Sequence, residues 1–261
     1  SVKWYIVRLK FTSLLHIGHD EAGIGIENVQ PIIHSDTLFS ALVNAANLLR
    51  ADLVDFLLIE DNFRISSCFP YRDSKYYLPR PLLPVPSVFG GLTKDVKSIE
   101  FLEGYDFLSW IQGNLQSDII PAIVNNSMEA KRSFTRRVRP RNTSDRMSHN
   151  TIIYHCGEIV FDYNCGLYFI LETNDDGKNK VSEILGILKT LGLGGERTAG
   201  YGKFDFEIIE ATEEPWRSIK NNEGNKWCIL SLWYPKENEF DGLQGNAMAY
   251  QSVIRKGWIF S

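Results

Sequence analysis

A glycine-rich run over residues 191–204, Leu-Gly-Leu-Gly-Gly-Glu-Arg-Thr-Ala-Gly-Tyr-Gly-Lys-Phe, constrains the fold of this chain more than any other feature. It follows an apolar, helix-like segment and leads into a strand-like segment, 203–209. Glycine adopts positive φ and lets the backbone approach a ligand closely, and successive bare amides form an anion-binding concavity. The run therefore predicts a phosphate-holding loop beside Arg197 and Tyr201. A long turn that needs glycine only for its geometry is the other interpretation. The glycines are Gly192, Gly194, Gly195, Gly200 and Gly202.

The surroundings of this loop exclude two common nucleotide-binding motifs. No Gly-Lys-Ser/Thr follows it, as a P-loop requires. A dinucleotide-binding fingerprint opens a helix after a strand, whereas this loop opens a strand after a helix.

Positive charge is concentrated in one short segment, residues 131–141, which contains no acid. Its six cations leave the rest of the chain at a net charge of −10, since the whole chain carries −4. An acidic body with one basic segment favours a local polyanion site over a generally basic nucleic-acid coat. Six cations without a counter-charge repel one another unless an anion binds, so RNA or DNA binding is favoured over a solvated charge run. The candidate residues are Arg132, Arg136, Arg137, Arg139, Arg141 and Arg146.

Hydrophobic periodicity predicts an α+β chain of alternating strands and helices. Ser35 or Asp36 is a suitable N-cap for a long helix that packs one apolar face on the core. Without its insertions the chain has the order β-α-β-β-α-β, which is the ferredoxin-like (RRM-like) pattern. The predicted elements are strand 4–11, helix 38–59, strands 63–69 and 75–78, short helices within 87–130, a hairpin over 131–159, strand 167–172, a turn at 174–177, helix 181–191 and strand 203–209.

The chain is expected to hold one well-formed domain and part of a second. Residues 1–210 make the first domain, with an insertion over 87–160. The polar, acidic stretch 211–225 is typical of a linker. Alternation resumes at Trp227, which predicts the first strand of a second ferredoxin-like domain over 226–261, and that range is too short for a complete unit.

Composition narrows the class of protein further. No run approaches the ~20 apolar residues of a membrane span. The four cysteines lie far apart with no Cys-x-x-Cys pair, which argues against zinc and against a disulfide framework and fits a cytoplasmic location. The pairs Asp52/Asp55 and Asp175/Asp176 form no convergent cluster with histidine, so neither a metal nor a cofactor is expected.

Five short motifs, taken together, form a set that recurs among related proteins. They are Leu15-His16-Ile17-Gly18, Ser35-Asp36-Thr37-Leu38-Phe39, Phe69-Pro70-Tyr71, Leu78-Pro79-Arg80-Pro81 and the glycine loop placed after the last helix. This set resembles the RAMP superfamily of CRISPR-associated proteins and, within it, the subunit-four family of the type III-A (Csm) effector complex. The resemblance covers residues 1–210 well and 226–261 in part, where Arg255-Lys256-Gly257-Trp258-Ile259 looks like the start of that family's second domain.

The resemblance implies a non-catalytic subunit that holds the 5′ handle of CRISPR RNA, between a large polymerase-like subunit and a backbone RAMP subunit. The glycine loop and the start of the first helix would lie against the handle, and a thumb-like hairpin drawn from 132–146 would lie near the first guide bases. The physics agrees, because a helix N-terminus offers amides to phosphate and arginines beside aromatics suit single-stranded RNA. The further RNA-binding residues that the resemblance implies are His16, Gly18, Ser35, Asp36 and Thr37.

Two other functions stay open at this point. Some RAMP proteins are metal-independent endoribonucleases that use a histidine as general acid and base. The candidates are His16, His19, His34, His149 and His155, although nothing pairs one of them with a second catalytic group. A pure protein-interaction subunit would use residues 79–86 and the tryptophans Trp110, Trp216 and Trp233, yet isolated tryptophans are more often core residues.

Overall fold

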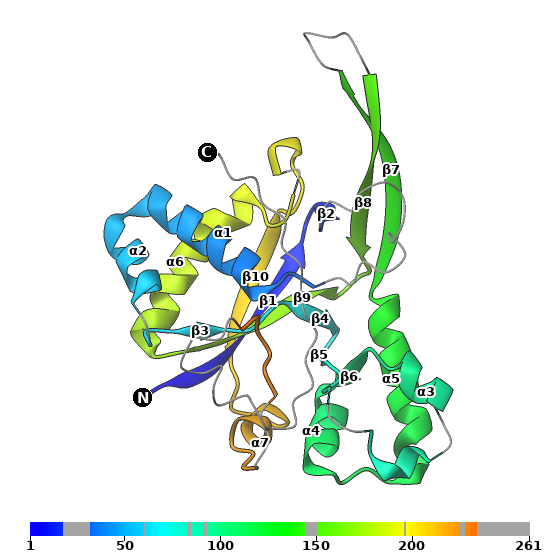
Figure 1. Cartoon of the computed structure of the whole chain (residues 1–261). Coiled ribbons are helices and arrows are strands. Elements are labelled where there is room, and N and C mark those ends of the chain that lie inside the picture. Colours follow the sequence, from blue (N-terminus) through cyan, green and yellow to red (C-terminus); the bar gives the residue numbers. More distant parts are fainter. Residues whose placement is uncertain are drawn as a thin grey trace, which may run out of the picture.

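The computed structural model of the chain (Figure 1) describes residues 1–17, 32–59, 61–82, 85–90, 93–144, 151–195, 197–224 and 228–233. Residues 141–144 and 151–156 are described by their main chain alone. The strands are β1 (Lys3–Phe11), β2 (Leu15–His16), β3 (Arg64–Ile65), β4 (Phe69–Arg72), β5 (Lys75–Pro79), β6 (Phe101–Glu103), β7 (Phe134–Ser144), β8 (Thr151–Phe161), β9 (Cys165–Thr173) and β10 (Phe204–Glu210). The α-helices are α1 (Ser35–Leu49), α2 (Ala51–Leu58), α3 (Thr93–Ser98), α4 (Gly104–Gln112), α5 (Ile120–Arg132), α6 (Asp175–Leu191) and α7 (Trp216–Lys220).

The main sheet is antiparallel, with the strand order β10-β1-β9-β4-β5-β6 and with β3 also paired to β9. β1 lies between β10 and β9 and places alternate residues on opposite faces. Tyr5, Val7 and Leu9 belong to a core that also contains apolar residues of α1, α2 and α6, whereas Ile6 belongs to a second core. The three helices therefore cover one face of the sheet, as Figure 1 shows.

The second core lies under the inserted helices α3, α4 and α5. Trp110 of α4 packs in it against Phe89, with ring centroids 5.2 Å apart. Trp216 of α7 is buried there too, 5.6 Å from the ring of Tyr76 and 5.9 Å from that of Tyr168. Both tryptophans are therefore core residues rather than exposed docking residues, and the segment predicted as a linker, 211–225, contains a helix that packs on the body of the protein.

The predicted hairpin is present and projects far from the body (Figure 1). β7 and β8 pair from Phe134↔Phe161 to Ser144↔Thr151, and β2 joins them as a third strand through Leu15↔Ile159 and His16↔Glu158. At the base of the hairpin, Phe161 stacks on Phe11 of β1 with ring centroids 5.2 Å apart. This second sheet ties the hairpin to the end of the body that carries the glycine loop.

Some predicted boundaries were wrong for identifiable reasons. The long helix 38–59 is broken at Arg50, which is extended (φ −167°, ψ 154°) and whose guanidinium bonds to Asp52 and Glu183. The predicted turn 174–177 is instead the start of α6, where Asn174 Oδ1 accepts a hydrogen bond from Gly177 N at 2.8 Å. The same polar residue types favour turns and helix caps, so the sequence pattern did not separate the two.

Two other segments also differ from the prediction. Residues 63–69 contain only the short β3 and the first residue of β4. Residues 228–233 form neither a helix nor a strand, and instead bond to the body through Ser67 N to Leu230 O at 2.8 Å. Most of the predicted second domain, 226–261, lies outside the described residues, and its domain assignment remains a prediction.

The α+β class itself is confirmed by the mixed helices and antiparallel sheets. Among the described residues, no helix has the length and apolar character needed to cross a bilayer.

Candidate nucleic-acid interface

The start of α1 and the glycine loop meet at one open hollow of about 320 Å³. Its lining residues are Asp36, Thr37, Ser40, Ala41, Asn44, Gly194 and Arg197. The fold thus brings together two segments that the sequence analysis selected separately. Ser40 and Asn44 were missed, although Asp36, Ser40 and Asn44 recur every four residues and so form a polar stripe along one side of the helix.

The first turn of α1 is held mostly by neighbouring chain rather than by its own cap. The helix begins at Ser35 after His34, which makes no side-chain capping bond. Ser35 is buried; its amide donates to Ser67 Oγ at 3.0 Å, and its hydroxyl accepts from Leu232 N at 2.9 Å. The prediction of Ser35 or Asp36 as N-cap was therefore wrong, and Ser35 is turned into the protein rather than toward a ligand.

Asp36 and Thr37 are the exposed residues of this helix start. Asp36 Oδ1 accepts hydrogen bonds from the amide of Thr37 at 2.6 Å and from its hydroxyl at 3.3 Å. A carboxylate at a helix N-terminus is stabilised by the helix dipole. The hollow is therefore lined both by the carboxylate-bearing Asp36 of α1 and by Arg197, whose 3₁₀ turn (Arg197–Ala199) is exposed.

The glycine loop needs most of its glycines for its own backbone geometry and for close approach to His16 of β2. Four of its glycines, Gly192, Gly194, Gly200 and Gly202, have φ between +74° and +87°. A Cβ on Gly202 would lie 1.8 Å from Leu193 O, and one on Gly194 would lie 2.3 Å from His16 O. The backbone at these positions therefore requires glycine. This supports the interpretation of the run as a long turn that needs glycine for its geometry.

The amides of the loop are largely occupied by the protein's own carbonyls. Gly192 N donates to Leu188 O, Gly195 N to His16 O, Gly200 N to Arg197 O and Gly202 N to Leu14 O, at 2.7–2.9 Å. These four amides are not bare, so the predicted phosphate cradle of successive free amides does not exist at these positions. The loop contributes two residues to the hollow. Gly194 lets a ligand come close to the backbone, and Arg197 supplies a charged side chain.

Tyr201 points into the protein. Its side chain is 7% exposed, and its hydroxyl donates to Oε1 of Glu158, itself 4% exposed, at 2.5 Å. The sequence analysis expected this ring beside a bound phosphate, whereas in the structure its hydroxyl faces Glu158 at the base of the hairpin. Glu158 was missed by the sequence analysis, although an acid flanked by Gly157 and Ile159 in a half-buried strand is unusual.

His16 is also buried, at 3% exposed. Its Nδ1 donates to the carbonyl oxygen of Gly157 at 2.7 Å, and a Cβ on Gly195 would lie 2.4 Å from its ring. The imidazole thus packs between the glycine loop and β8. A buried ring fixed in this way is placed for a structural role rather than for proton transfer to an exposed substrate.

The arginines of the basic segment divide between the two faces of β7. Arg137 and Arg139 are exposed and share one face by strand alternation, opposite Glu158 and Cys156 in register. Arg136 lies on the other face, half-buried over the ring of Phe134 at 5.4 Å. Burial lowers the pKa of Arg136, against the opposing effect of nearby Glu100. Because it is half-buried, Arg136 is less accessible to a phosphate than the exposed Arg137 and Arg139.

The remaining members of the basic segment have different surroundings. Arg132 ends α5 and is exposed. Lys131 forms an ion pair with Glu100 at 2.9 Å, so the premise that all six cations lack a counter-charge was wrong. Arg141 lies in β7 with only its main chain described, whereas Gly18 and Arg146 lie outside the described residues, as do His19 and His149.

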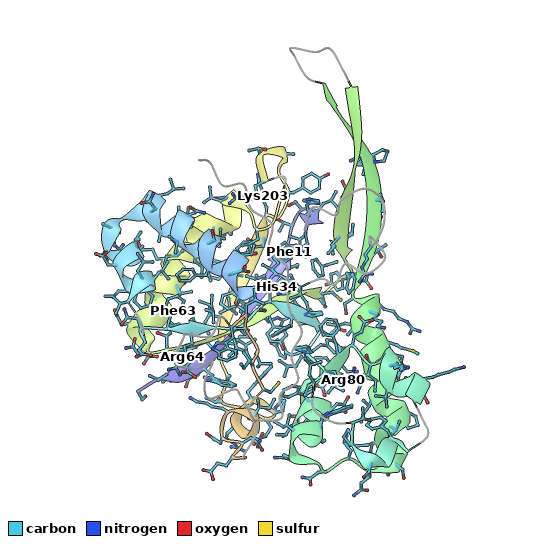
Figure 2. The ribbon with its side chains drawn as sticks, viewed as in Figure 1. Phe11, His34, Phe63, Arg64, Arg80 and Lys203 are labelled. Carbon is cyan, nitrogen blue, oxygen red and sulfur yellow. The ribbon has the colours of Figure 1, made fainter. Side chains whose placement is uncertain are left out.

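Within the described part of the chain, no three His, Cys, Asp or Glu side chains come close enough together to hold a metal ion. In Figure 2, Lys203 and Phe11 lie toward the end of the body from which the hairpin rises, whereas Arg64 and Arg80 lie toward the other end. The hollow and the exposed Arg137 and Arg139 of β7 are candidates for parts of one interface.

Comparison with known proteins identifies relatives of this chain. "CRISPR system Cms protein Csm4" of Thermococcus onnurineus is 29% identical over 69% of this chain and 64% of its own length, so the chain spans less than two thirds of that relative. The protein of the same name from Methanocaldococcus jannaschii is 25% identical over 100% of this chain and 80% of its own length.

Two solved structures resemble the fold. The crystal structure of a Csm3-Csm4 subcomplex in the type III-A CRISPR-Cas interference complex matches with a TM-score of 0.54 at 21% identity, over 79% of this chain and 69% of that one. A Csm1-Csm4 cassette in complex with cA4 matches with a TM-score of 0.53 at 22% identity, over 79% and 70%.

The family comparison agrees with the fold and with the motifs quoted from the sequence. The model of the RAMP superfamily matches residues 8–205, from β1 through the hairpin and the glycine loop into β10. This chain belongs to the RAMP superfamily.

Proposed function

We propose that this chain is the Csm4-type subunit of a type III-A CRISPR complex and that it holds the 5′ handle of the CRISPR RNA without cleaving it. Membership of the RAMP superfamily and relatives named Csm4 support the first part. The hollow formed by α1 and the glycine loop carries the second part, because it joins an exposed arginine to polar groups of a helix start.

The chemistry of the hollow suits a ribose-phosphate unit better than a free phosphate. Arg197 supplies a cation and planar N–H donors, and the α1 N-terminus supplies a favourable dipole. Asp36 is an acceptor-only group when ionised, so it would repel a phosphate but accept a hydrogen bond from a 2′-hydroxyl or a base amino group. A single-stranded RNA presents all of these groups with its bases splayed apart.

The hairpin extends this interface. Arg137 lies directly opposite Glu158 on the β7–β8 ribbon, and Arg139 lies on the same face, two residues further from the body. Glu158 in turn bonds to Tyr201 of the glycine loop. An RNA strand that leaves the hollow along this face would meet both arginines. We assign them to phosphate contacts, with Arg132 at the base, and assign Tyr201, His16 and Ser35 to support of the interface from beneath.

The partners follow from the relatives. Their solved complexes pair Csm4 with Csm1 and with Csm3, so we propose that this chain bridges a large Csm1-type subunit and a Csm3-type backbone subunit. A cytoplasmic location and binding without a cofactor belong to the same proposal.

The proposal is tested by the preference of the full-length chain for handle RNA over a scrambled RNA of equal length. Arg197→Ala removes the cation of the hollow, and we expect this preference to be lost. Arg217→Ala is the matched control, because Arg217 is an exposed arginine of α7 that pairs with Glu214 at 2.7 Å, away from the hollow. Equal behaviour of the two variants would contradict the assignment of the hollow.

The alternative function, a RAMP endoribonuclease with a histidine general acid and base, finds less support in the site. His16 is buried and bonded to Gly157 O. His34 precedes α1 and is half-buried. Neither arrangement favours catalysis, and a cleavage assay separates the two functions.

A further inference from the structure

A buried carboxylate lies where the hairpin meets the body. Glu158 is 4% exposed and belongs to β8, with Arg137 directly opposite on β7 and His16 directly opposite on β2. Burying a carboxylate carries a desolvation penalty unless hydrogen bonds compensate for it. The burial of Glu158 therefore adds little to the stability of the protein. Because Glu158 lies where the hairpin joins the body, it is a candidate for fixing the orientation of the hairpin.

The contact that compensates for this burial comes from the glycine loop. Tyr201 donates its hydroxyl proton to Glu158 Oε1 at 2.5 Å. Two further bonds reinforce the same junction: His16 Nδ1 donates to Gly157 O at 2.7 Å, and Gly195 N donates to His16 O at 2.9 Å. The glycine loop, β2 and β8 are thus joined by one chain of short polar contacts.

A small rotation at this junction becomes a large displacement along the hairpin. β7 continues for seven residues from Arg137 to its end at Ser144, which is roughly 24 Å at about 3.4 Å per residue. Elsewhere at the base, Arg72 lies 3.4 Å from Asp162 Oδ2 and donates to Arg132 O at 3.4 Å, contacts at the long end of the hydrogen-bond range. The Tyr201–Glu158 bond is buried, whereas these contacts of Arg72 are exposed.

We propose that Tyr201 and Glu158 are positioning residues whose hydrogen bond sets the direction of the hairpin relative to the hollow. The inference rests on the proposed function in one respect: the direction of the hairpin determines which nucleotide of a bound RNA meets Arg137 and Arg139. Neither Tyr201 nor Glu158 touches the RNA, and both act by holding the two RNA-facing parts in register.

The first test needs no RNA. Nitroxide labels on ketone-bearing amino acids at Val138 (47% exposed, on β7) and Leu48 (exposed, on α1) report the distance between hairpin and body in the full-length chain. We expect one narrow distance distribution in the parent, loss of that narrow peak in Tyr201→Phe, and its retention in Glu158→Gln, whose amide oxygen still accepts the bond. An unchanged distribution in Tyr201→Phe would overturn the proposal.

A double variant guards against loss of folding. Tyr201→Phe alone leaves a buried carboxylate without its donor, whereas Tyr201→Phe with Glu158→Leu removes both partners, and such paired replacements can be nearly neutral for stability. We expect the double variant to fold and to lose the narrow peak. Retention of the peak in the double variant would contradict the proposal as firmly as retention in Tyr201→Phe.

The second test reads the RNA register. A photo-crosslinking benzoylphenylalanine at position 135, an exposed residue on the same face of β7 as Arg137 and Arg139, marks the nucleotide that it faces in bound handle RNA. We expect one main cross-linked position in the parent and in Glu158→Gln, and cross-links spread over several positions in Tyr201→Phe. If the parent binds no handle RNA, the proposed function fails, while the distance measurement still decides whether the contact positions the hairpin.

Discussion

Lys131 Nζ lies 2.9 Å from Oε1 of Glu100, and the same ammonium group donates to Ser98 O at 3.1 Å. One cation of the basic segment is therefore used to fix the end of α5 to the chain at and just after the end of α3. Among the described residues, Arg137 and Arg139 form no ion pair and are exposed. The paired Lys131 can therefore serve as the control for substitutions of the unpaired Arg137 and Arg139.

Replacing Arg137 and Arg139 together by alanine is expected to weaken RNA binding across all sequences and to reduce its salt dependence. Each phosphate contact to a single strand adds about 0.7 to the slope of log K against log salt, so the slope should fall by about 1.4. Titrations of fluorescent single-stranded RNA at several salt concentrations measure it. Lys131→Met is the control and should leave the slope nearly unchanged; equal slopes for all three proteins would argue against phosphate contacts on the hairpin.

The glycines of the loop and of α6 predict a graded series in stability. Gly200→Ala places a Cβ in open space at φ +87°, so it should lose only the strain of a left-handed residue, about 1–2 kcal/mol. Gly202→Ala adds a clash with Leu193 O and should lose much more. Gly186→Ala lies in α6 in open space and should stabilise by about 0.5–1 kcal/mol. Urea unfolding of the three variants gives the order, and a Gly202→Ala protein as stable as Gly200→Ala would show that the loop packs differently.

Tyr5→Phe is expected to flatten the pH dependence of stability at both extremes. The Tyr5 hydroxyl, bonded to Asp175 at 2.5 Å, is the main cause that holds the pKa of Asp175 below its ordinary 3.8, with Lys3 next. A lowered carboxyl pKa contributes stability above pH 3.8 that is lost as the pH falls through the lowered value. Burial, followed by the bond to Asp175, raises the pKa of Tyr5 to about 12, so its contribution is present below pH 10 and is lost between pH 10 and about 12.

The measurement is the free energy of unfolding across the pH range, for the parent and for Tyr5→Phe. The variant should lose less stability than the parent on acidification below pH 4 and on titration above pH 10. Parallel curves for the two proteins would mean that the Tyr5–Asp175 bond does not exist in solution.

His16→Ala is expected to destabilise the protein without changing the fate of bound RNA. It removes the donor to Gly157 O from a buried site, and the loss of such a bond costs about 1–3 kcal/mol. Urea unfolding measures this effect, and a denaturing gel of the recovered RNA measures cleavage. A variant of normal stability whose RNA cleavage differs from that of the parent would move His16 from a structural to a catalytic role.

The sequence predicted the elements of this fold well where periodicity was long and regular. β1, the hairpin and β10 were placed within a few residues, because alternation over many positions identifies a strand regardless of its partners. Residues 174–177 were assigned to a turn because Asn, Asp and Gly serve turns and helix starts alike. At the break, Arg50 contacts Glu183 of α6, a tertiary contact that no local pattern contains.

The candidate site was predicted in its parts but not in its internal geometry. The helix start and the glycine loop were both identified, and they do meet at the hollow. The sequence could not tell that Tyr201 points inward to Glu158, since both an open ring and a buried ring are compatible with one tyrosine between two glycines. Nor could it tell that two of the loop amides bond to the carbonyls of Leu14 and His16, because these partners lie far away in the chain, at β2 and just before it.

One titration decides between holding and cutting RNA. Labelled handle RNA and a scrambled RNA are each titrated with the full-length chain without added metal, and the recovered RNA is run on a denaturing gel. We predict that the handle RNA is bound in preference to the scrambled RNA and is recovered intact. Cleaved RNA, or equal affinity for the two RNAs, would contradict a non-catalytic subunit that holds the 5′ handle.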